Sequence, residues 1–255
     1  MTYISCLIVI VLSISVVGCV SSQSDDQSAP PQTGRPTMIA VRAAQPVKID
    51  GHLDDPVWQQ APAYSLNLSQ DKLDAGERLK EGGRVRLAYD DKYFYAAFEY
   101  VDSDVVAEGK EDDMHHYRFG DVAELFLSPD GRPYYWELYV TPAGRKTAFL
   151  FPSIGRIELP SSIEYQCGLK VAAQVQGTLN NWRDRDRGWT GEMAMPIADL
   201  TAEGDKFDGS QGWSVFVGRY NHSVYFKEKE LSMTPVLPRT SYHLREHYAK
   251  LKLQP

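Results

Sequence analysis

The feature that most constrains the fold is a succession of short segments rich in aromatic and β-branched residues, separated by turn signals. The first four are RVRLAY (84–89), YFYAAFEYV (93–101), VAELFLS (122–128) and YYWELYVT (134–141). The tripeptide Asp90-Asp91-Lys92 separates the first two segments, and PDGRP separates the next two. Asp130-Gly131 in that second loop tolerates positive φ, which tight hairpin turns require. The pattern therefore predicts two β-hairpins.

Five more segments continue the pattern: RKTAFLF (145–151), LKVAAQVQ (169–176), WTGEMAMP (189–196), WSVFVGRY (213–220) and KLKL (250–253). Helix signals are few. The best are residues 55–61, with Asp55 as N-cap and Pro56 at the first helical position, and residues 197–200. The sequence therefore predicts an all-β fold, a two-sheet antiparallel β-sandwich of jelly-roll-like or related type with one or two short helices.

The stretch IDGHLDDPVW (49–58) combines a turn, a helix start and a large aromatic residue. We expect Asp50-Gly51 to turn the chain after the first strand and Asp54 or Asp55 to cap a short helix. That helix would place Trp58 on one end of the sandwich, where it would close the core and not serve as a ligand platform.

The beginning of the chain resembles a secretion signal. The apolar run from Cys6 to Gly18 is shorter than the about 20 residues that a membrane-spanning helix needs, so it indicates a signal peptide. The run ends in Val16-Val17-Gly18-Cys19, which resembles a bacterial lipobox and predicts lipidation at Cys19; an ordinary signal cleaved nearby is the alternative. Residues 1–18 would then be the signal, 19–37 a flexible tether and 38–255 the folded domain, held by a lipid at the bacterial outer membrane, in the periplasm or at the surface.

Charge and cysteine content exclude other classes of protein. The formal net charge of -7 and the absence of a long basic run make nucleic acid an unsuitable partner. Removal of Cys6 with the signal and acylation of Cys19 would leave Cys167 alone, so no internal disulfide is expected. We expect Cys167 to be a packing residue and not a nucleophile.

Several blocks together resemble a known family. They are IDGHLDDPVW, RVRLAYDDKYFYAAFEYVD, GDVAELFLSPD, YYWELYVTPAG, GWTGEMAMPIADL, GWSVFVGRY and SYHLREHYAKLKL, from about Val41 to Leu253. In this order they are similar to the family 9 carbohydrate-binding modules and their DOMON-like relatives. The resemblance implies a β-sandwich that holds a sugar between aromatic rings and hydrogen-bonds its hydroxyls, without cleaving it.

The resemblance also implies a set of binding residues. Glu124 matches the sugar-binding carboxylate, and Asp121 the acid before it in the motif. Tyr242 stands where the second aromatic clamp residue would be. Arg118 occupies the place of the first clamp residue, with Tyr117 and Phe119 beside it.

Three further positions depart from the family pattern or extend it. Tyr139 stands in place of a sugar-binding arginine, Arg239 stands in place of an asparagine, and Arg219 is on a strand expected to line the same region. The implied partner is a mono- or oligosaccharide, with a surface polysaccharide-degrading enzyme as a further partner. The departures leave the identity of the sugar open.

Other functions compete with this interpretation. Glu124 and Glu137, on adjoining strands, could form the acid pair of a glycoside hydrolase, although ligand binding is the commoner use of such carboxylates. Haem-binding relatives use Met and His ligands, for which the candidates here are Met193, Met195, Met233, His222 and His243. An accessory structural domain without a ligand is a third alternative.

The sequence also contains candidate metal ligands. Oxygen-rich turns at Asp90, Asp91, Asp102 and Asp104 suggest calcium, without EF-hand spacing to support it. The adjacent His115 and His116 should point in different directions, so they are not expected to share a metal ion. Trp182, in a loop rich in Arg and Asp, is expected to fold back onto the domain.

Overall fold

The structure is a computed structural model, which describes residues 34–157, 159 and 165–255. The predicted signal peptide, the lipidation residue Cys19 and most of the predicted tether lie outside the described residues. The part from Gly34 to Pro255 is one compact unit. Arg35 already belongs to it, because its Nε donates a hydrogen bond to the carbonyl oxygen of Tyr248 at 2.7 Å.

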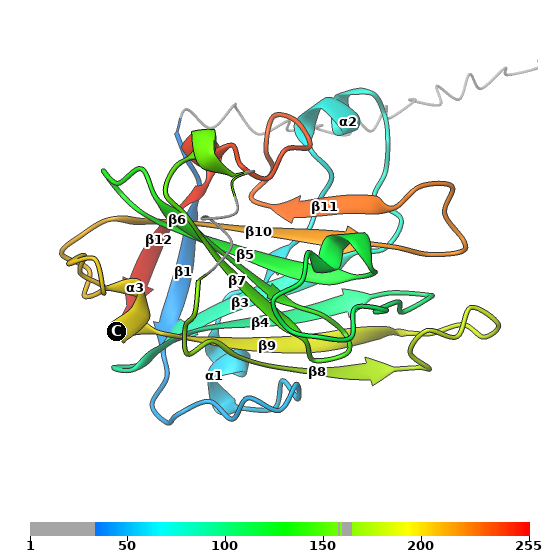
Figure 1. Cartoon of the computed structure of the whole chain (residues 1–255), viewed down its shortest axis with the longest axis horizontal. Helices are drawn as coiled ribbons and strands as arrows, with labels where there is room; N and C mark the ends of the chain where they lie inside the picture. Colours follow the sequence, from blue (N-terminus) through cyan, green and yellow to red (C-terminus); the bar gives the residue numbers. More distant parts are fainter. Residues whose placement is uncertain (1–33, 158, 160–164) are drawn as a thin grey trace, which may run out of the picture. The chain divides into compact units, whose positions relative to one another are not determined.

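Strands dominate the described part of the chain (Figure 1). The first six are β1 (Thr37–Arg42), β2 (Tyr64–Ser65), β3 (Gly83–Tyr89), β4 (Tyr93–Val101), β5 (Val122–Pro129) and β6 (Tyr135–Val140). The next six are β7 (Lys146–Phe151), β8 (Lys170–Gln176), β9 (Gly188–Pro196), β10 (Trp213–Asn221), β11 (Glu230–Thr234) and β12 (Ala249–Gln254). Every segment predicted as a strand is a strand, and the predicted all-β class is confirmed.

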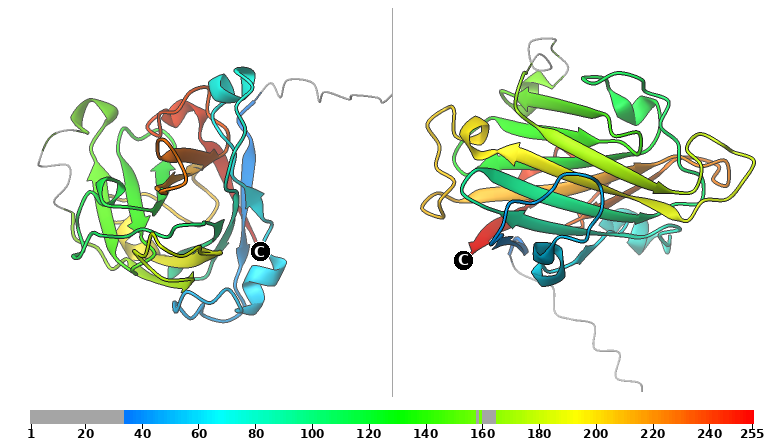
Figure 2. Two further views of the ribbon diagram at one scale, coloured as in Figure 1. Left: turned by 90° about the vertical axis from the view of Figure 1, so that its right-hand side faces the viewer. Right: turned by 90° about the horizontal axis from the view of Figure 1, so that it is seen from below.

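The strands are hydrogen-bonded in the order β7-β6-β5-β10-β12-β1-β3-β4-β9-β8, with β11 on β10 and β2 on β3. The sheet curves until its two ends face each other, so that β6 contacts both β8 and β9 (Figure 2). β1 pairs in parallel with both β12 and β3, whereas the other pairs are antiparallel. The two layers are thus parts of one continuous mixed sheet. No hairpin sets the direction of β1, because both its neighbours are distant in sequence.

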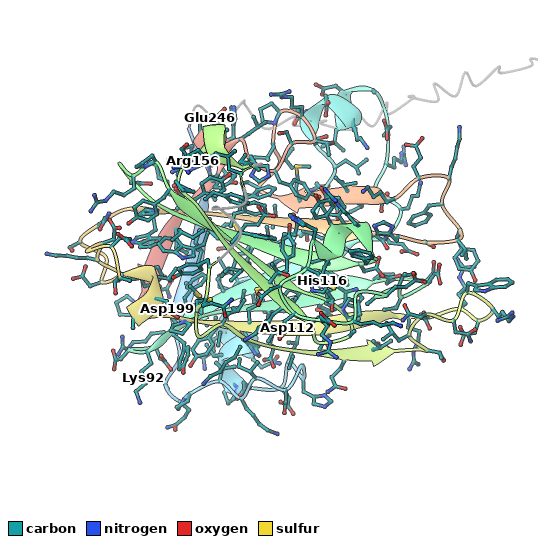
Figure 3. The ribbon with its side chains drawn as sticks, viewed as in Figure 1. Lys92, Asp112, His116, Arg156, Asp199 and Glu246 are labelled. Atoms are coloured by element: carbon teal, nitrogen blue, oxygen red, sulfur yellow. The ribbon has the colours of Figure 1, made fainter. Side chains whose placement is uncertain are left out.

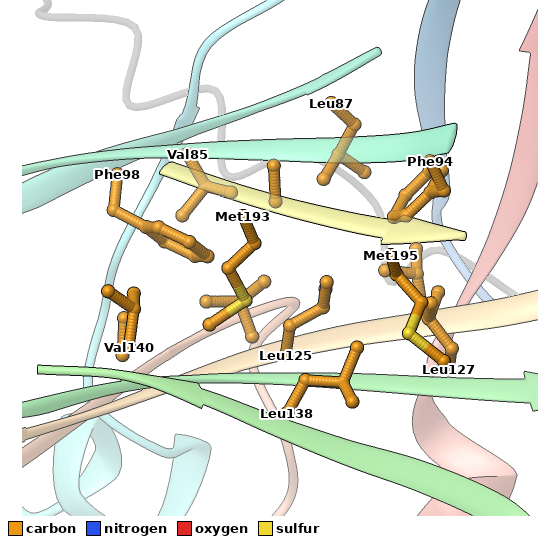
Figure 4. Packing of buried hydrophobic residues seen from close by; sticks show 14 of the residues in the cluster. Val85, Leu87, Phe94, Phe98, Leu125, Leu127, Leu138, Val140, Met193 and Met195 are labelled. Carbon is orange, nitrogen blue, oxygen red and sulfur yellow. The ribbon is translucent and has the colours of Figure 1, made fainter. Parts of the chain in front are cut away.

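The core lies between the two layers (Figure 4). Val85, Phe98 and Met193 on one layer face Leu125 and Leu138 on the other. These side chains are fully buried, and each alternates along its strand with residues on the opposite face. Three tryptophans also belong to this core, since all are at most 3% exposed: Trp136, Trp189 and Trp213.

Helices are short: α1 (Pro56–Gln60), α2 (Gln70–Asp74), α3 (Ile197–Leu200) and the 3₁₀ turns η1 (His116–Arg118), η2 (Ile154–Arg156) and η4 (Arg245–His247). Both predicted helices are present, with Asp55 at the N-cap of α1 and Pro56 after it, but the Asp55 side chain makes no capping hydrogen bond. The sequence did not predict α2, β2 or β11. In the part of the chain that is described, no helix is long and apolar enough to cross a bilayer.

The stretch IDGHLDDPVW is fastened to β9 by one carboxylate. Glu192 accepts hydrogen bonds from Trp58 Nε1 at 2.8 Å and from the backbone N–H groups of Asp50 and Gly51 at 3.1 and 2.9 Å. Trp58 is 2% exposed, so its predicted role in packing is confirmed. Its predicted place is wrong, because α1 packs on the outer face of β1, β3, β4 and β9 and not on one end of the sandwich.

We expect Trp58→Ala to lower the free energy of unfolding by about 3–5 kcal/mol, since it opens a cavity under α1. Trp58→Phe retains most of the apolar contact but leaves one oxygen of Glu192 without its donor, so a smaller loss of about 1–3 kcal/mol is expected. Urea unfolding followed by circular dichroism measures both values. A loss below 1 kcal/mol for the alanine variant would contradict this account.

Candidate functional site: a cavity floored by two carboxyl groups

A cavity of about 550 Å³ opens on the outer face of β5, β6, β7 and β10, on the side of these strands away from the core. Its volume is in the range of small-molecule sites, about 300–1,000 Å³. The lining residues are mostly aromatic or ionisable: His115, Tyr117, Arg118, Glu124, Glu137, Tyr139, Phe149, Phe151, Ile157, Tyr220, Ser241, Tyr242 and His243.

Glu124 and Glu137 project from neighbouring strands on this face. Glu124 is paired with Tyr139, and Phe126 with Glu137, so the two glutamates are diagonal neighbours. They are 2% and 4% exposed. The Tyr139 hydroxyl donates to Oε1 of Glu137. Oε1 of Glu124 and Oε2 of Glu137 have no hydrogen-bond partner among the described residues.

Burial dominates the electrostatics of this pair. It raises the pKa of Glu124 well above its ordinary range, and the charge of Glu137 raises it further. Burial also raises the pKa of Glu137 to about 8, against the opposing effect of the hydrogen bond from Tyr139. In the absence of a ligand the pair therefore retains protons at pH values where exposed carboxyls have lost them.

Three tyrosines form one wall of the cavity. Tyr220 lies between the others, with its ring centroid 5.4 Å from that of Tyr117 and 5.6 Å from that of Tyr242. The Tyr242 hydroxyl donates to the carbonyl oxygens of Arg219 and Ser232 at 2.8 and 2.9 Å, which fixes the ring. Gly218 permits this position, because a Cβ there would lie 2.4 Å from the Tyr242 ring.

The other wall comes from β7 and two loops. Phe149 stacks on His115 at 5.3 Å and on Phe151 at 5.6 Å. His243 packs edge-on to Phe151, and burial lowers its pKa to about 4, so it is neutral at pH 7. Tyr135 packs against Phe151 of this wall, and its hydroxyl hydrogen-bonds His243 Nδ1 at 2.8 Å.

The positive charges near the cavity are at its mouth. Arg118 is exposed, and its guanidinium lies 5.5 Å from the Tyr117 ring centroid. Lys229, also exposed, has its Nζ 4.8 Å from the Tyr220 ring centroid. Solvent screens the charges of both side chains. The mouth of the cavity therefore carries exposed basic groups, whereas its floor carries buried carboxyl groups.

The loop at the mouth is fixed to β7. The N–H of Asp113 donates to the carbonyl oxygen of Lys146 at 2.8 Å, and Asp112 accepts from the Lys146 N–H at 3.1 Å. Figure 3 places Asp112 and His116 close together on this loop. His115 lines the cavity whereas His116 is buried away from it, so the two histidines diverge as expected.

Five of the predicted binding residues line this one cavity: Glu124, Tyr242, Tyr117, Arg118 and Tyr139. Four others lie elsewhere: Phe119, Asp121, Arg219 and Arg239. Phe119 is 40% exposed beyond the end of η1 and does not replace a clamp ring. Arg239 is exposed on the loop between β11 and η4, away from the cavity lining.

Asp121 and Arg219 have structural partners inside the domain. Arg219 is fully buried, and its guanidinium pairs with Asp102 at 2.9 Å. Asp121 accepts hydrogen bonds from the N–H groups of Val106 and His222 at 2.7 and 2.6 Å. Arg219 lies outside the cavity because side chains alternate along a strand: Tyr220 faces the cavity, so the adjacent Arg219 faces the core.

Sequence reasoning missed several lining residues, chiefly Tyr220, Phe149 and Phe151, and gave His243 and Glu137 other roles. Alternation could have found Tyr220, since it is two positions from Gly218, the partner of Glu124. No local signal marks Phe149 and Phe151, which look like ordinary strand residues.

The calcium hypothesis does not fit the residues proposed for it. Asp90-Asp91 and Asp102-Asp104 stand at opposite ends of β4. Asp90 accepts from the N–H groups of Lys92 and Tyr93, and Asp104 from that of Val224. Within the described residues, no group of three or more His, Cys, Asp or Glu could hold a metal ion.

The haem candidates are also dispersed. Met193 and Met195 are buried between the layers, on the opposite side of the sheet from His243. The sulfur of Met233 accepts from the Leu237 N–H at 3.4 Å, and His222 Nε2 lies 3.2 Å from the Tyr117 carbonyl oxygen. No Met–His pair facing a common space is evident among these five.

Trp182 and Cys167 are outside the cavity. Trp182 is 59% exposed, with Arg183 4.5 Å from the centroid of its indole, so the expected fold-back is wrong. The Arg183 guanidinium lies over one face of the Trp182 ring, and the ring does not pack against the body of the domain. Cys167 is a half-buried free thiol, and burial raises its pKa, which suits a packing residue.

Comparisons with solved structures identify the fold. A Bacteroides uniformis protein assigned provisionally as carbohydrate-binding matches 87% of this chain and 100% of its own, with a TM-score of 0.62 and 11% identity. A family 9 carbohydrate-binding module from Caldicellulosiruptor kristjanssonii in complex with cellotriose matches 86% of this chain and 93% of its own (TM-score 0.54, 13% identity). The same kind of module in complex with glucose gives 85% and 95% (TM-score 0.53, 12% identity).

No protein-family model matches the sequence, and no curated protein matches it significantly. At 11–13% sequence identity, the similarity to these structures shows the fold alone. The expected resemblance to family 9 modules is confirmed at that level.

The buried carboxyl pair predicts that stability falls as pH rises from 7 to 9. The folded chain retains protons on Glu124 and Glu137 that the unfolded chain has already released, so unfolding becomes more favourable as they ionise. Glu137 alone should contribute about 1 kcal/mol over this window, which lies above the titration range of the histidines. Glu137→Gln should flatten the dependence in urea unfolding at pH 7, 8 and 9. A stability that rises across these values would be incompatible with the pair.

Proposed function

We propose that this chain is a non-catalytic carbohydrate-binding module. The observation that carries the proposal is a cavity in which aromatic walls surround the carboxyl groups of Glu124 and Glu137. A pyranose presents apolar C–H faces that pack on aromatic rings, and its hydroxyls donate to carboxyl oxygens without a partner. The walls and the floor therefore match the two kinds of surface on a sugar.

The arrangement of the two glutamates suits binding better than hydrolysis. A glycosidase places its two carboxyl groups on opposite sides of the bond that it breaks. Glu124 and Glu137 come from neighbouring strands of one sheet, so they approach a ligand from the same side. The hydroxyl of Tyr139 also occupies one oxygen of Glu137.

The solved relatives support a sugar as the ligand. Two are modules from Caldicellulosiruptor kristjanssonii in complex with cellotriose and with glucose. Their shared fold makes mono- and short oligosaccharides the first ligands to test here.

In this proposal a lipid on Cys19 tethers the module to the bacterial envelope, at the outer membrane facing the periplasm or the outside. The predicted tether shortens to residues 19–33, since the compact unit begins at Gly34, and a coil of that length would span about 20 Å on average. The module would concentrate saccharides there for a surface polysaccharide-degrading enzyme.

Sugar binding should be weak and should depend on the cavity rings. One stacked ring with a few hydrogen bonds gives at most about 5–7 kcal/mol, which corresponds to dissociation constants of about 10–200 micromolar or weaker. We expect Tyr117→Ala to weaken the binding of glucose or cellotriose at least about tenfold in isothermal titration. Tyr117 is a half-buried wall residue, so the fold should tolerate its truncation.

Trp182→Ala is the matched control, because it removes an exposed aromatic ring outside the cavity. It should leave binding unchanged. Absence of heat with every neutral or amino sugar up to tens of millimolar would refute the proposed function, as would equal losses in the two variants.

Lipid anchoring has its own test. Cys19→Ser should release the chain from the membrane fraction, because a serine hydroxyl cannot replace the thiol that accepts the lipid. Cys167→Ser, which changes the half-buried thiol of the domain, should stay with the membranes. Fractionation and immunoblotting of cells measure both. Retention of the Cys19 variant at the wild-type level would rule out the anchor.

A further inference from the structure

We propose that the cavity selects a saccharide with a free amino group, whose ammonium lies between Glu124 Oε1 and Glu137 Oε2. This inference rests on the proposed function and adds the chemical class of its ligand. Its basis is the pair of buried acceptor atoms on the cavity floor for which the described residues provide no donor.

The inventory of donors and acceptors favours an ammonium over a hydroxyl. The Tyr139 hydroxyl is already committed to Glu137 Oε1, and Glu124 Oε1 and Glu137 Oε2 have no hydrogen-bond partner among the described residues. A sugar hydroxyl donates one hydrogen, so it can satisfy only one of these two oxygens. An ammonium has three hydrogens to donate and no acceptor. It can bridge both free oxygens at once.

The charge balance points the same way. Two buried carboxyl groups line the cavity, and no arginine or lysine is bonded to either of them among the described residues. The nearest basic group is His243, whose Nε2 lies 3.9 Å from Glu137 Oε2. A buried carboxylate without a counter-charge is costly, so the pair keeps its protons until a cation from the ligand compensates the ionised form. Aromatic rings around the floor, such as Tyr139, Tyr220 and Phe149, add a favourable environment for a cation.

The remaining titratable groups near the pair do not supply this charge. Burial raises the pKa of the neighbouring phenols, which are therefore neutral: Tyr135, Tyr139, Tyr220 and Tyr242. Burial lowers the pKa of His243 to about 4 and also lowers that of His115. The charge of Lys229 acts to lower the pKa of Glu124, but burial outweighs it. Lys229 and Arg118 are both exposed, over the rings of Tyr220 and Tyr117.

Binding of an ammonium should displace protons from the pair. Without a ligand the carboxyl groups are protonated, because burial raises the pKa of both. An ammonium between them favours their ionised forms, so complex formation releases protons into the buffer. A neutral sugar that hydrogen-bonds the protonated pair releases none.

The experiment compares three probes by isothermal titration at pH 7 with EDTA present: glucosamine, glucose and N-acetylglucosamine. N-acetylglucosamine keeps the nitrogen but removes its charge. We expect glucosamine to bind at least tenfold more tightly than the other two. Titration in phosphate and in Tris, which differ in ionisation enthalpy, should show proton release for glucosamine alone.

Glu137→Gln tests the residue assignment. The amide keeps the shape of the side chain but cannot carry a negative charge, so glucosamine should lose more affinity than glucose and the preference for glucosamine should disappear. Glu124→Gln should act in the same way, and the wild-type comparison decides the matter if either variant does not fold.

Equal affinity for glucosamine and glucose would overturn this inference and leave the proposed function standing. So would N-acetylglucosamine binding as tightly as glucosamine, or a preference for glucosamine that survives both substitutions. Failure of all three probes and of every other sugar would instead remove the proposed function itself.

Discussion

Burial of β5 on both faces is the constraint on which the rest of the structure depends. All its residues from Val122 to Pro129 are buried, although a strand covered on one face only would alternate. Leu125 and its inward neighbours join the core between the layers, while Glu124 and Phe126 join the cavity side. The core therefore fixes the backbone that holds the carboxyl floor, and the site inherits the rigidity of a central strand.

The same arrangement explains why an ionisable pair can persist inside the domain. Leaving a buried acceptor without a partner costs about 1–3 kcal/mol, and burying a charge costs more. The domain keeps two such acceptors next to each other, in a cavity where the phenols and His243 stay neutral. Groups with perturbed pKa values that converge on one cavity mark functional sites more often than chance predicts. In the proposed function a ligand supplies the donors that the chain itself does not.

Two kinds of carboxylate in this domain differ in how their hydrogen-bonding capacity is met. Glu192 accepts three hydrogen bonds from Trp58, Asp50 and Gly51, so it fastens the first turn to β9. Glu124 and Glu137 retain free oxygens that line a cavity. In the proposed function this difference separates structural acids from binding acids, and it cannot be read from residue type.

Most of the fold and part of the site could be predicted from the sequence. Strands such as β4 and β9 have strong β-propensity and clear turn signals at their ends, which are local properties. β11 was missed because ELSMT has a polar start and no turn signal of its own. At the site, Glu124 and Tyr242 were found through a resemblance, whereas Arg219 was misplaced because the alternation along β10 was not applied to it.

The sequence by itself determined the all-β class, the places of the strands, the turn at Asp50-Gly51 and the acidic and aromatic character of the residues that reach the cavity. These follow from local propensity and from the two-residue period of a strand. Only the tertiary structure decided that β1 joins the layers in parallel, that Tyr242 packs over Gly218, and that Glu124 and Glu137 share one cavity with Phe149 and Phe151. Those outcomes depend on contacts between segments far apart in the chain, and local sequence preferences do not specify them.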